Sequence, residues 1–327
     1  MEPLMEPTTP RRPRVTIGMP TYNRRDGYFP RALASALAQD YPRLEVLVCD
    51  NASTDGTAEY IASLDDERLR YLRHELNIGA NANFNSCLEN ATGDYFLLLH
   101  DDDLIDPTFV SRCLAALGDG PDVGLVRTGS RVIGADGEVL AVNRTNTAGL
   151  DGAEVMLRWF RRETPLYLAS TLYNTRWLRE IGGFNSPHGL YQDVKATAML
   201  MARHGHHDVA EVLASFRRHD DNRGSSVKAV QWAEDAVHLL DVIEREFPVR
   251  KNELTEIGNA YLCQKCYRVA SAITDPVERW RTYRQVNEMF DGAASPLVYE
   301  VRRYWRLLKG GLRGQVKAVV GRDAVAP

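Results

Sequence analysis

The chain has 327 residues, of which 44% are hydrophobic and 26% charged, and its formal net charge is −4. These values are typical of a globular protein and exclude a generally basic, nucleic-acid-binding surface. The five cysteines are odd in number and scattered, which favours a reducing compartment over a disulfide framework. The first residues lack the apolar core of a signal peptide, and no apolar run reaches the ~18 residues that span a membrane. We therefore expect a cytoplasmic protein that binds no nucleic acid.

The first third of the chain predicts strands and helices in alternation. The expected strands are 14–20, 44–51, 68–74 and 94–101. The expected helices are 29–39, 53–64, 80–92 and a helix with Asp106 as N-cap and Pro107 as first residue, ending near Leu117. Strands that alternate with helices of this length predict an α/β fold with a mostly parallel sheet and helices on both faces.

The alternation weakens after residue 120. Residues 123–142 predict a hairpin with a Gly-Ala-Asp-Gly turn, and residues 208–219 predict another strand. From residue 226 to about 309 the pattern is mostly helical. We therefore expect a disordered N-terminus (1–12), an α/β domain (13–227) and a helical C-terminal extension with a basic tail (228–327).

Polar residues follow three of the predicted strands. They are Thr21, Tyr22 and Asn23 after the first strand, Asp50 and Asn51 after the second, and Asp101, Asp102 and Asp103 after the fourth. The carboxyl ends of parallel strands lie on one rim of a sheet, where ligands of such folds bind. We therefore expect these three groups to converge on one binding site.

The three consecutive aspartates repel one another unless a cation or hydrogen-bond donors compensate. Carboxylates, together with water and phosphate oxygens, are the natural ligands of Mg²⁺ or Mn²⁺. The triplet therefore predicts a divalent ion that bridges the rim to a nucleotide diphosphate. The alternative is a solvated acidic loop before the next helix.

At this point several segments together resemble the family 2 glycosyltransferases with the GT-A fold. They are "VTIGMPTYNR", "LEVLVCDNASTDGT", "LNIGANANFN", "GDYFLLLHDDDLIDP", "WLREIGGFN", "YQDVKATAMLMARHG" and "FRRHDDNRGSS", in that order over residues 13 to 227. The resemblance implies a Rossmann-like GT-A domain that transfers a sugar, with inversion, from a nucleotide diphosphate donor to an acceptor hydroxyl.

The resemblance also assigns roles to individual residues. Positions that hold the base, ribose or closing loop of the donor correspond to Pro20, Tyr22, Asn23, Asn51, Asn77, Gly79, Asn81 and Asp101. Asn51 stands where many members have Asp. An Asn carbonyl still accepts a hydrogen bond from a pyrimidine N–H, so UDP- and dTDP-sugars both stay open as donors.

The implied metal ligands are Asp102, Asp103 and His219, with Asp102 as the main ligand of Mn²⁺ or Mg²⁺. Asp103 has the sugar as an alternative partner, and a plain surface histidine is the alternative for His219. Asp193 matches the general base that takes the proton of the acceptor hydroxyl. The alternative for Asp193 is a helix N-cap, and the two roles are compatible.

The basic tail suggests a further partner. Val298, Val301, Trp305, Leu308 and Leu312 have helical spacing with Arg and Lys between them, which is typical of a helix on an anionic membrane surface. A helix packed on residues 226–295 with a solvated basic face is the favoured alternative. Peripheral contact with the inner face of the membrane and a homodimer therefore both stay open.

The sequence leaves the acceptor open as well: a glycan, a lipid-linked sugar or a natural product. Two rival functions also remain. One is a sugar nucleotidyltransferase, which would need a glycine-rich, lysine-bearing phosphate loop after the first strand. The other is a catalytically inactive sugar-nucleotide-binding protein, against which the presence of both Asp102 and Asp193 argues.

Overall fold

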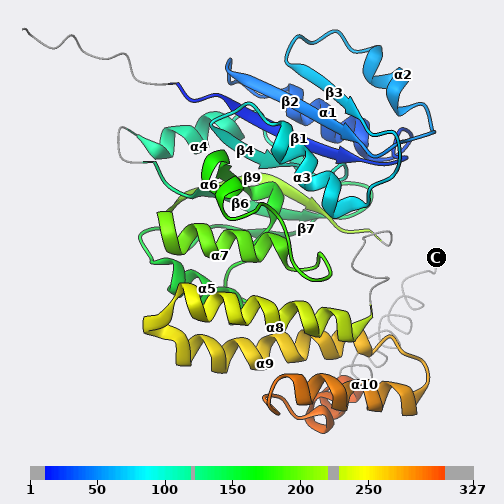
Figure 1. The fold of residues 1–327 in the computed structure, drawn as a ribbon, viewed down its shortest axis with the longest axis vertical. Helices are drawn as coiled ribbons and strands as arrows, with labels where there is room; N and C mark the ends of the chain where they lie inside the picture. Colours follow the sequence, from blue (N-terminus) through cyan, green and yellow to red (C-terminus); the bar gives the residue numbers. More distant parts are fainter. Residues whose placement is uncertain (1–11, 119–121, 220–227, 306–327) are drawn as a thin grey trace, which may run out of the picture.

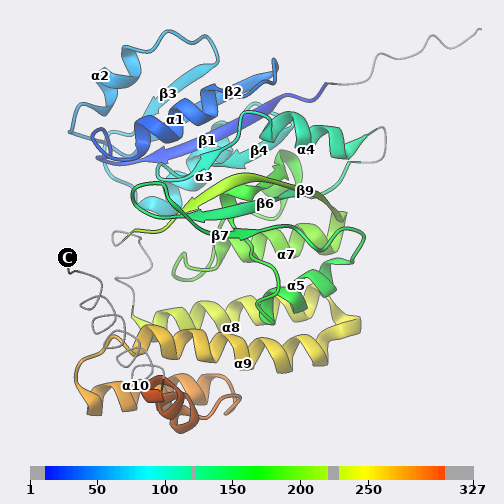
Figure 2. The same cartoon turned by 180° about the vertical axis from the view of Figure 1, so that it is seen from behind.

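The structure is a computed structural model that describes residues 12–118, 122–219 and 228–305 (Figure 1). The predicted disordered N-terminus, most of the basic tail and the end of the "FRRHDDNRGSS" segment lie outside these ranges. Within the described residues, a sheet with helices on both faces forms one end of the molecule, and further helices are stacked below it, as the view from behind also shows (Figure 2).

The sheet contains nine strands among the described residues, in the order β3-β2-β1-β4-β8-β6-β9-β5, with β7 paired to β6. The strands are β1 (Val15–Thr21), β2 (Leu44–Asp50), β3 (Leu69–Arg73), β4 (Tyr95–Leu98), β5 (Leu104–Ile105), β6 (Leu125–Ile133), β7 (Val139–Asn143), β8 (Thr171–Asn174) and β9 (His206–Arg217). The pairs among β1, β2, β3 and β4 are parallel, as predicted. Beyond β4 only β6 and β9 pair in parallel, so the sheet as a whole is mixed.

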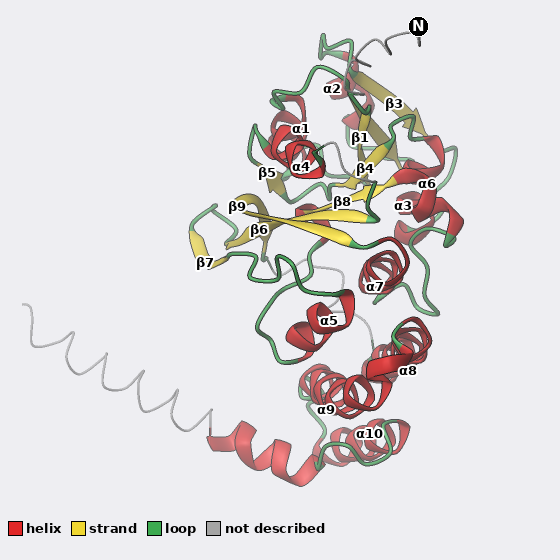
Figure 3. Ribbon diagram, turned by 90° about the vertical axis from the view of Figure 1, so that its left-hand side faces the viewer, coloured by secondary structure: helices red, strands yellow, loops and turns green. Residues whose placement is uncertain are grey.

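Helices cover both faces of the sheet. They are α1 (Phe29–Leu37), α2 (Thr57–Ala62), α3 (Ala80–Asn90), α4 (Phe109–Leu117), α5 (Gly152–Phe160), α6 (Thr175–Glu180) and α7 (Gln192–His204). Successive residues of β4 point to opposite faces, so Tyr95 and Leu97 pack with α1 and α4 while Phe96 and Leu98 pack with α3 and α7. Figure 3 shows helices on both sides of the sheet. The two cores between the sheet and these helices explain why the strands are almost continuously apolar.

The structure corrects the predicted start of α4. The helix begins at Phe109, and its N-cap is Thr108 rather than Asp106. Asp106 stays extended because its N–H donates to the carbonyl oxygen of Leu213 at 2.8 Å, beside the short antiparallel pair of β5 and β9. The Asp106 carboxylate instead forms an ion pair with Arg131 at 2.5 Å.

The predicted hairpin is confirmed as β6 and β7, and its turn is closed by the Gly134 N–H donating to the carbonyl oxygen of Glu138 at 2.9 Å. The strand predicted within 208–219 is β9. The sequence did not predict α5, β8 or α6, which lie between the hairpin and α7. β8 and α6 have only four and six residues, too few for a clear hydrophobic period. α5 has nine residues, as α1 and α4 do, so its length does not account for the missed helix.

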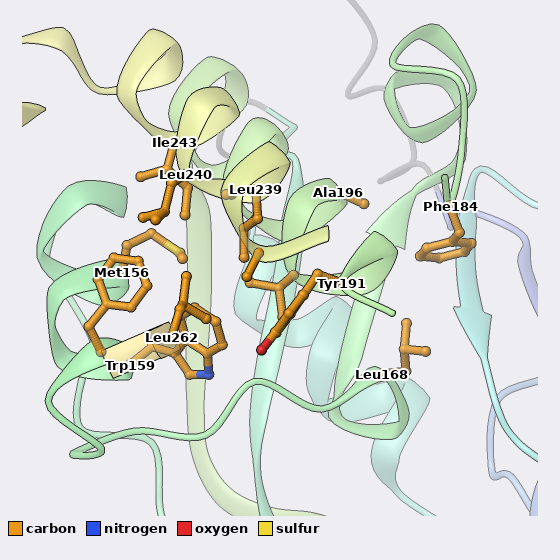
Figure 4. Packing of buried hydrophobic residues seen from close by; sticks show 14 of the residues in the cluster. Met156, Trp159, Leu168, Phe184, Tyr191, Ala196, Leu239, Leu240, Ile243 and Leu262 are labelled. Atoms are coloured by element: carbon orange, nitrogen blue, oxygen red, sulfur yellow. The ribbon is translucent and has the colours of Figure 1, made fainter. Parts of the chain in front are cut away.

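The C-terminal region is helical, as predicted, with α8 (Ala229–Glu246), α9 (Lys251–Ala270), α10 (Pro276–Met289) and a further helix from residue 296. Its apolar residues belong to the same core cluster as α5 and α7. Figure 4 shows Leu239 and Ile243 of α8 and Leu262 of α9 in this core with Trp159 and Tyr191. The domain boundary at residue 227 stays a prediction. None of the described helices combines the length and the apolarity that crossing a bilayer requires.

A buried carboxylate ties the C-terminal helices to the loop before α7. Asp235 of α8 is fully buried and accepts hydrogen bonds from the Ser186 hydroxyl at 2.6 Å and from the backbone N–H groups of His188 and Leu190 at 2.6 and 2.8 Å. This loop runs directly into the first turn of α7. The position of that turn therefore depends on α8.

We expect Asp235→Ala to lower the free energy of unfolding by about 3 kcal/mol, because several buried donors lose their acceptor. Urea unfolding measures the change. Asp241→Ala, at an exposed position of the same helix, is the control and should change stability by less than about 0.5 kcal/mol. Equal losses in the two variants would contradict the anchoring role.

Candidate active site

The loops after β1 and β2 are joined through Asn23. Its N–H donates to the Ser53 hydroxyl at 2.8 Å, and its Oδ1 accepts from the N–H of Thr54 at 2.8 Å. The residue has a left-handed backbone (φ 51°), a conformation in which Asn is several-fold enriched. Pro20 is buried within β1, opposite Cys49 of β2, and Tyr22 at the end of β1 is 46% exposed. The first two strand ends therefore lie side by side, as predicted.

The buried side chain of Asn51 connects the end of β2 to the loop before α3. Asn51 Nδ2 donates to Asn77 Oδ1 at 2.8 Å, and Asn51 Oδ1 accepts from the N–H of Ile78 at 2.8 Å. Asn77 Oδ1 also accepts from the N–H of Gly79 at 2.9 Å, and Gly79 has a positive φ of 86°. The structure thus brings Asn51, Asn77 and Gly79 together.

Asn81 lies apart from this network, on the first turn of α3. Its Nδ2 donates to the carbonyl oxygen of Phe184 at 3.2 Å, in the Gly-Gly-Phe segment. Its buried Oδ1 has no hydrogen-bond partner among the described residues. Asn81 is therefore directed to the loop that precedes α7 rather than to Asn51.

The acidic triplet follows β4 and reaches the end of β1. Asp101 Oδ2 accepts from the Thr21 hydroxyl at 2.9 Å. Burial, and next the negative charge of Asp102, raise the pKa of Asp101 to about 6. The third strand end therefore joins the first two, so the predicted convergence holds for all three.

Asp102 and Asp103 are held by residues from the end of β9. Asp102 Oδ2 lies 2.9 Å from Nε2 of His219, while Asp103 Oδ1 accepts from the backbone N–H of Arg217 at 2.9 Å. The Arg217 side chain is 1% exposed and donates to the carbonyl oxygen of Asp102 at 2.9 Å. Burial, and next the charge of Asp102, hold the pKa of Asp103 well above its usual range.

One group in this region has the composition of a cation site. His100, Asp102 and Asp103 each offer a ligand atom, and these atoms lie within 4.8 Å of one another. Two carboxylates and an imidazole suit Mn²⁺ or Mg²⁺ when substrate and water oxygens complete the coordination. The residues present therefore fit the predicted metal. The histidine of this group is His100, whereas the predicted ligand His219 contacts Asp102 instead.

Asp193 lies in the first turn of α7, whose N-cap is Tyr191, so the predicted N-cap role of Asp193 is wrong. Burial raises the pKa of its carboxyl, and the charges of Lys265 and His100 oppose this shift. His100 therefore acts electrostatically on Asp193 while it also belongs to the cation group. His100 thus links the acidic triplet to Asp193, although they belong to different elements.

Three residues of the site were not assigned from the sequence: His100, Arg217 and Lys265. His100 directly precedes the triplet, and Arg217 lies in the "FRRHDDNRGSS" segment, so proximity to these motifs could have indicated both. Lys265 lies in the middle of α9 within an ordinary helical pattern. No local signal distinguishes it.

A comparison with family models decides the family. Residues 16–178 match the model for glycosyl transferase family 2. The chain belongs to this family. It is 36% identical over 105 residues to the Escherichia coli (strain K12) protein WcaA, whose name assigns it to colanic acid biosynthesis as a glycosyl transferase; the match covers 32% of this chain and 37% of that protein. The chain spans less than half the length of the curated relatives it matches.

Solved structures establish the fold of this family 2 member as GT-A. Residues 1–349 of Staphylococcus aureus TarS, in complex with UDP-GlcNAc, align with a TM-score of 0.56 at 16% identity, over 86% of this chain and 93% of that one. The Pyrobaculum calidifontis mannosyltransferase PcManGT, in complex with GDP-Man and Mn²⁺, aligns with a TM-score of 0.52 at 21% identity, over 91% and 88%. Both alignments extend beyond residue 178, so they include parts of the chain outside the family match.

We expect Asp101→Asn to stabilise the metal-free protein at pH 7.5 by about 2 kcal/mol. The raised pKa means that the folded state binds this proton more tightly, so wild-type stability falls as pH rises from about 4 through about 6. The Asn variant escapes this loss. Urea unfolding in EDTA at pH 4 and pH 7.5 measures the free energy of unfolding of both proteins. The prediction is refuted if the variant differs from the wild type by the same amount at the two pH values.

Proposed function

We propose that the protein is an inverting, metal-dependent glycosyltransferase that moves a sugar from a nucleotide diphosphate donor to an acceptor hydroxyl. The observation that carries the proposal is the placement of His100, which belongs to the acidic cation group and also acts on Asp193. One site therefore has carboxylates for a diphosphate-bound cation and a separate carboxylate for the acceptor. Inversion needs the two kinds of carboxylate on opposite sides of the sugar, because the acceptor attacks from the face opposite the leaving diphosphate.

The donor side is formed by the three strand ends. Asn51 Oδ1 accepts one hydrogen bond from Ile78 and has a second lone pair for the N–H of a pyrimidine, which supports UDP- and dTDP-sugars as donors. Asp102, Asp103 and His100 would hold Mn²⁺ or Mg²⁺. When bound, the cation would offset the charge of the departing diphosphate. His219 supports Asp102 through the 2.9 Å contact.

Asp193 is the proposed general base. Asp193 is half-buried in the first turn of α7, where the charges of Lys265 and His100 act on it. Desolvation raises the pKa of its carboxyl, which makes the carboxylate a stronger proton acceptor. The acceptor hydroxyl donates its proton to this carboxylate as the hydroxyl oxygen attacks the anomeric carbon. The loop tied to Asp235 positions the turn from which Asp193 acts.

The proposal also covers the acceptor, the oligomeric state and contact with a membrane. A glycan, a lipid-linked sugar and a natural product are the candidate acceptors, and a homodimer is compatible with them. Val298, Val301 and Trp305 of the predicted amphipathic helix are 48%, 48% and 61% exposed. The same helix packs on the preceding helices through Tyr299, whose ring centre lies 5.3 Å from that of Tyr267 and 5.8 Å from that of Tyr283. This packing supports the packed alternative with a solvated basic face. Leu308, Lys309 and Leu312 lie outside the described residues.

Asp102→Asn should reduce Mn²⁺-dependent hydrolysis of a UDP- or dTDP-sugar by at least about a hundredfold, because the main ligand loses its charge. His219→Gln should lose about tenfold, since it changes only the support of that ligand. Release of UDP or dTDP in a screen of nucleotide sugars measures both. Equal activity of wild type and Asp102→Asn would refute a metal site here. Formation of UTP or dTTP and a sugar 1-phosphate when diphosphate is added, in place of UDP or dTDP release, would favour a nucleotidyltransferase.

Asp193→Asn should lower kcat by about a thousandfold, because proton transfer to a base is lost. Thermal stabilisation by UDP with Mn²⁺ should remain, since the donor side is intact. Asp241→Asn, at an exposed site on α8, is the matched control for both measurements. Full activity of Asp193→Asn would rule out this residue as the base. Donor binding without turnover in the wild type would favour an inactive binding protein.

A further inference from the structure

A pocket of about 810 Å³ lies between the second half of α9, the residues after α5 and the helix that begins at residue 296. Four cations line it: Arg162, Lys265, Arg268 and Arg302. None of its described lining residues is acidic. A concave surface that is lined by one sign of charge concentrates ligands of the opposite sign.

Two of these arginines have no acidic partner among the residues that the structure describes. Arg162 and Arg268 are exposed, and neither forms an ion pair with another described residue. The nearby Arg161, by contrast, pairs with Glu253 at 2.9 Å. Arg162 also has a left-handed backbone (φ 65°), which is unfavourable for a residue other than glycine and is concentrated at functional sites.

Lys265 connects the pocket to the proposed base. Its Nζ lies 4.6 Å from the ring centre of Tyr191, 5.5 Å from that of Trp232 and 5.7 Å from that of Trp159. These aromatic faces stabilise the cation. Tyr191 precedes Asp193 by two residues, and the positive charge of Lys265 lowers the pKa of Asp193. A ligand in the pocket therefore lies beside the acceptor side of the site. In Figure 1, α9 also runs towards the side of the molecule where β1 ends.

We infer that this pocket binds a negatively charged phosphate or carboxylate group of the glycosyl acceptor and so directs an acceptor hydroxyl to Asp193. The inference deepens the proposed function and rests on it. A neutral acceptor would leave the guanidinium groups of Arg162 and Arg268 without an acidic partner among the described residues. An anionic group would supply that partner.

Binding of three labelled oligomers tests the inference: a glycerol phosphate hexamer, a glucuronate hexamer and the neutral maltohexaose. Fluorescence anisotropy with the full chain, saturated with UDP and Mn²⁺, measures affinity. The wild type should bind at least one anionic oligomer more tightly than maltohexaose. Preference for phosphate or for carboxylate identifies the source of the charge. Arg162→Gln and Arg268→Gln should each weaken that binding about three- to fivefold.

Arg281→Gln, at an exposed position of α10 that does not line the pocket, is the matched control and should bind as the wild type does. The inference is overturned if maltohexaose binds equally well, if no oligomer binds, or if Arg281→Gln causes the same loss as Arg268→Gln. A separate measurement tests the proposed function. If UDP with Mn²⁺ does not stabilise the protein against heat, the proposed function itself is wrong.

Discussion

The site depends on how three adjacent carboxylates are kept at the end of a buried strand. Each of the three has a different donor: the Thr21 hydroxyl for Asp101, the His219 ring for Asp102 and the Arg217 backbone for Asp103. Two of these donors come from the end of β9. The short strand β5 directly follows the triplet and pairs antiparallel with β9, so this pairing brings the end of β9 to the triplet.

The C-terminal helices contribute to the same site from the opposite side. Asp235 of α8 fixes the loop before α7, and the charge of Lys265 of α9 acts on Asp193. A glycosyltransferase domain that ended near residue 227 would leave both the loop and Trp159 without these partners. In the proposed function, the helical region would contribute to the acceptor half of the site, and the strand ends would form the donor half.

The sequence predicted the part of the fold in which apolar residues recur with a clear helical or strand period. Alternating strands and helices from β1 to α4 were predicted because each is apolar on defined faces, and the polar strand ends could then be placed on one rim. Asp106 was misassigned because a tertiary contact with β9 overrides its preference for a helix cap. Lys265 could not be found, since its aromatic and acidic neighbours come from α5, α7 and α8, and no local pattern records such contacts.

Asn51 illustrates how one change of side chain alters the donor half. An aspartate at this position could accept from Ile78, but it could not donate to Asn77. The amide does both, so the loop before α3 is fixed to β2 by a neutral pair. Asn77 in turn holds Gly79 at the start of α3. The same side chain thus orders the loop over the proposed nucleotide site and keeps a lone pair for the base, without adding a further carboxylate to a rim that already holds Asp50 and the acidic triplet.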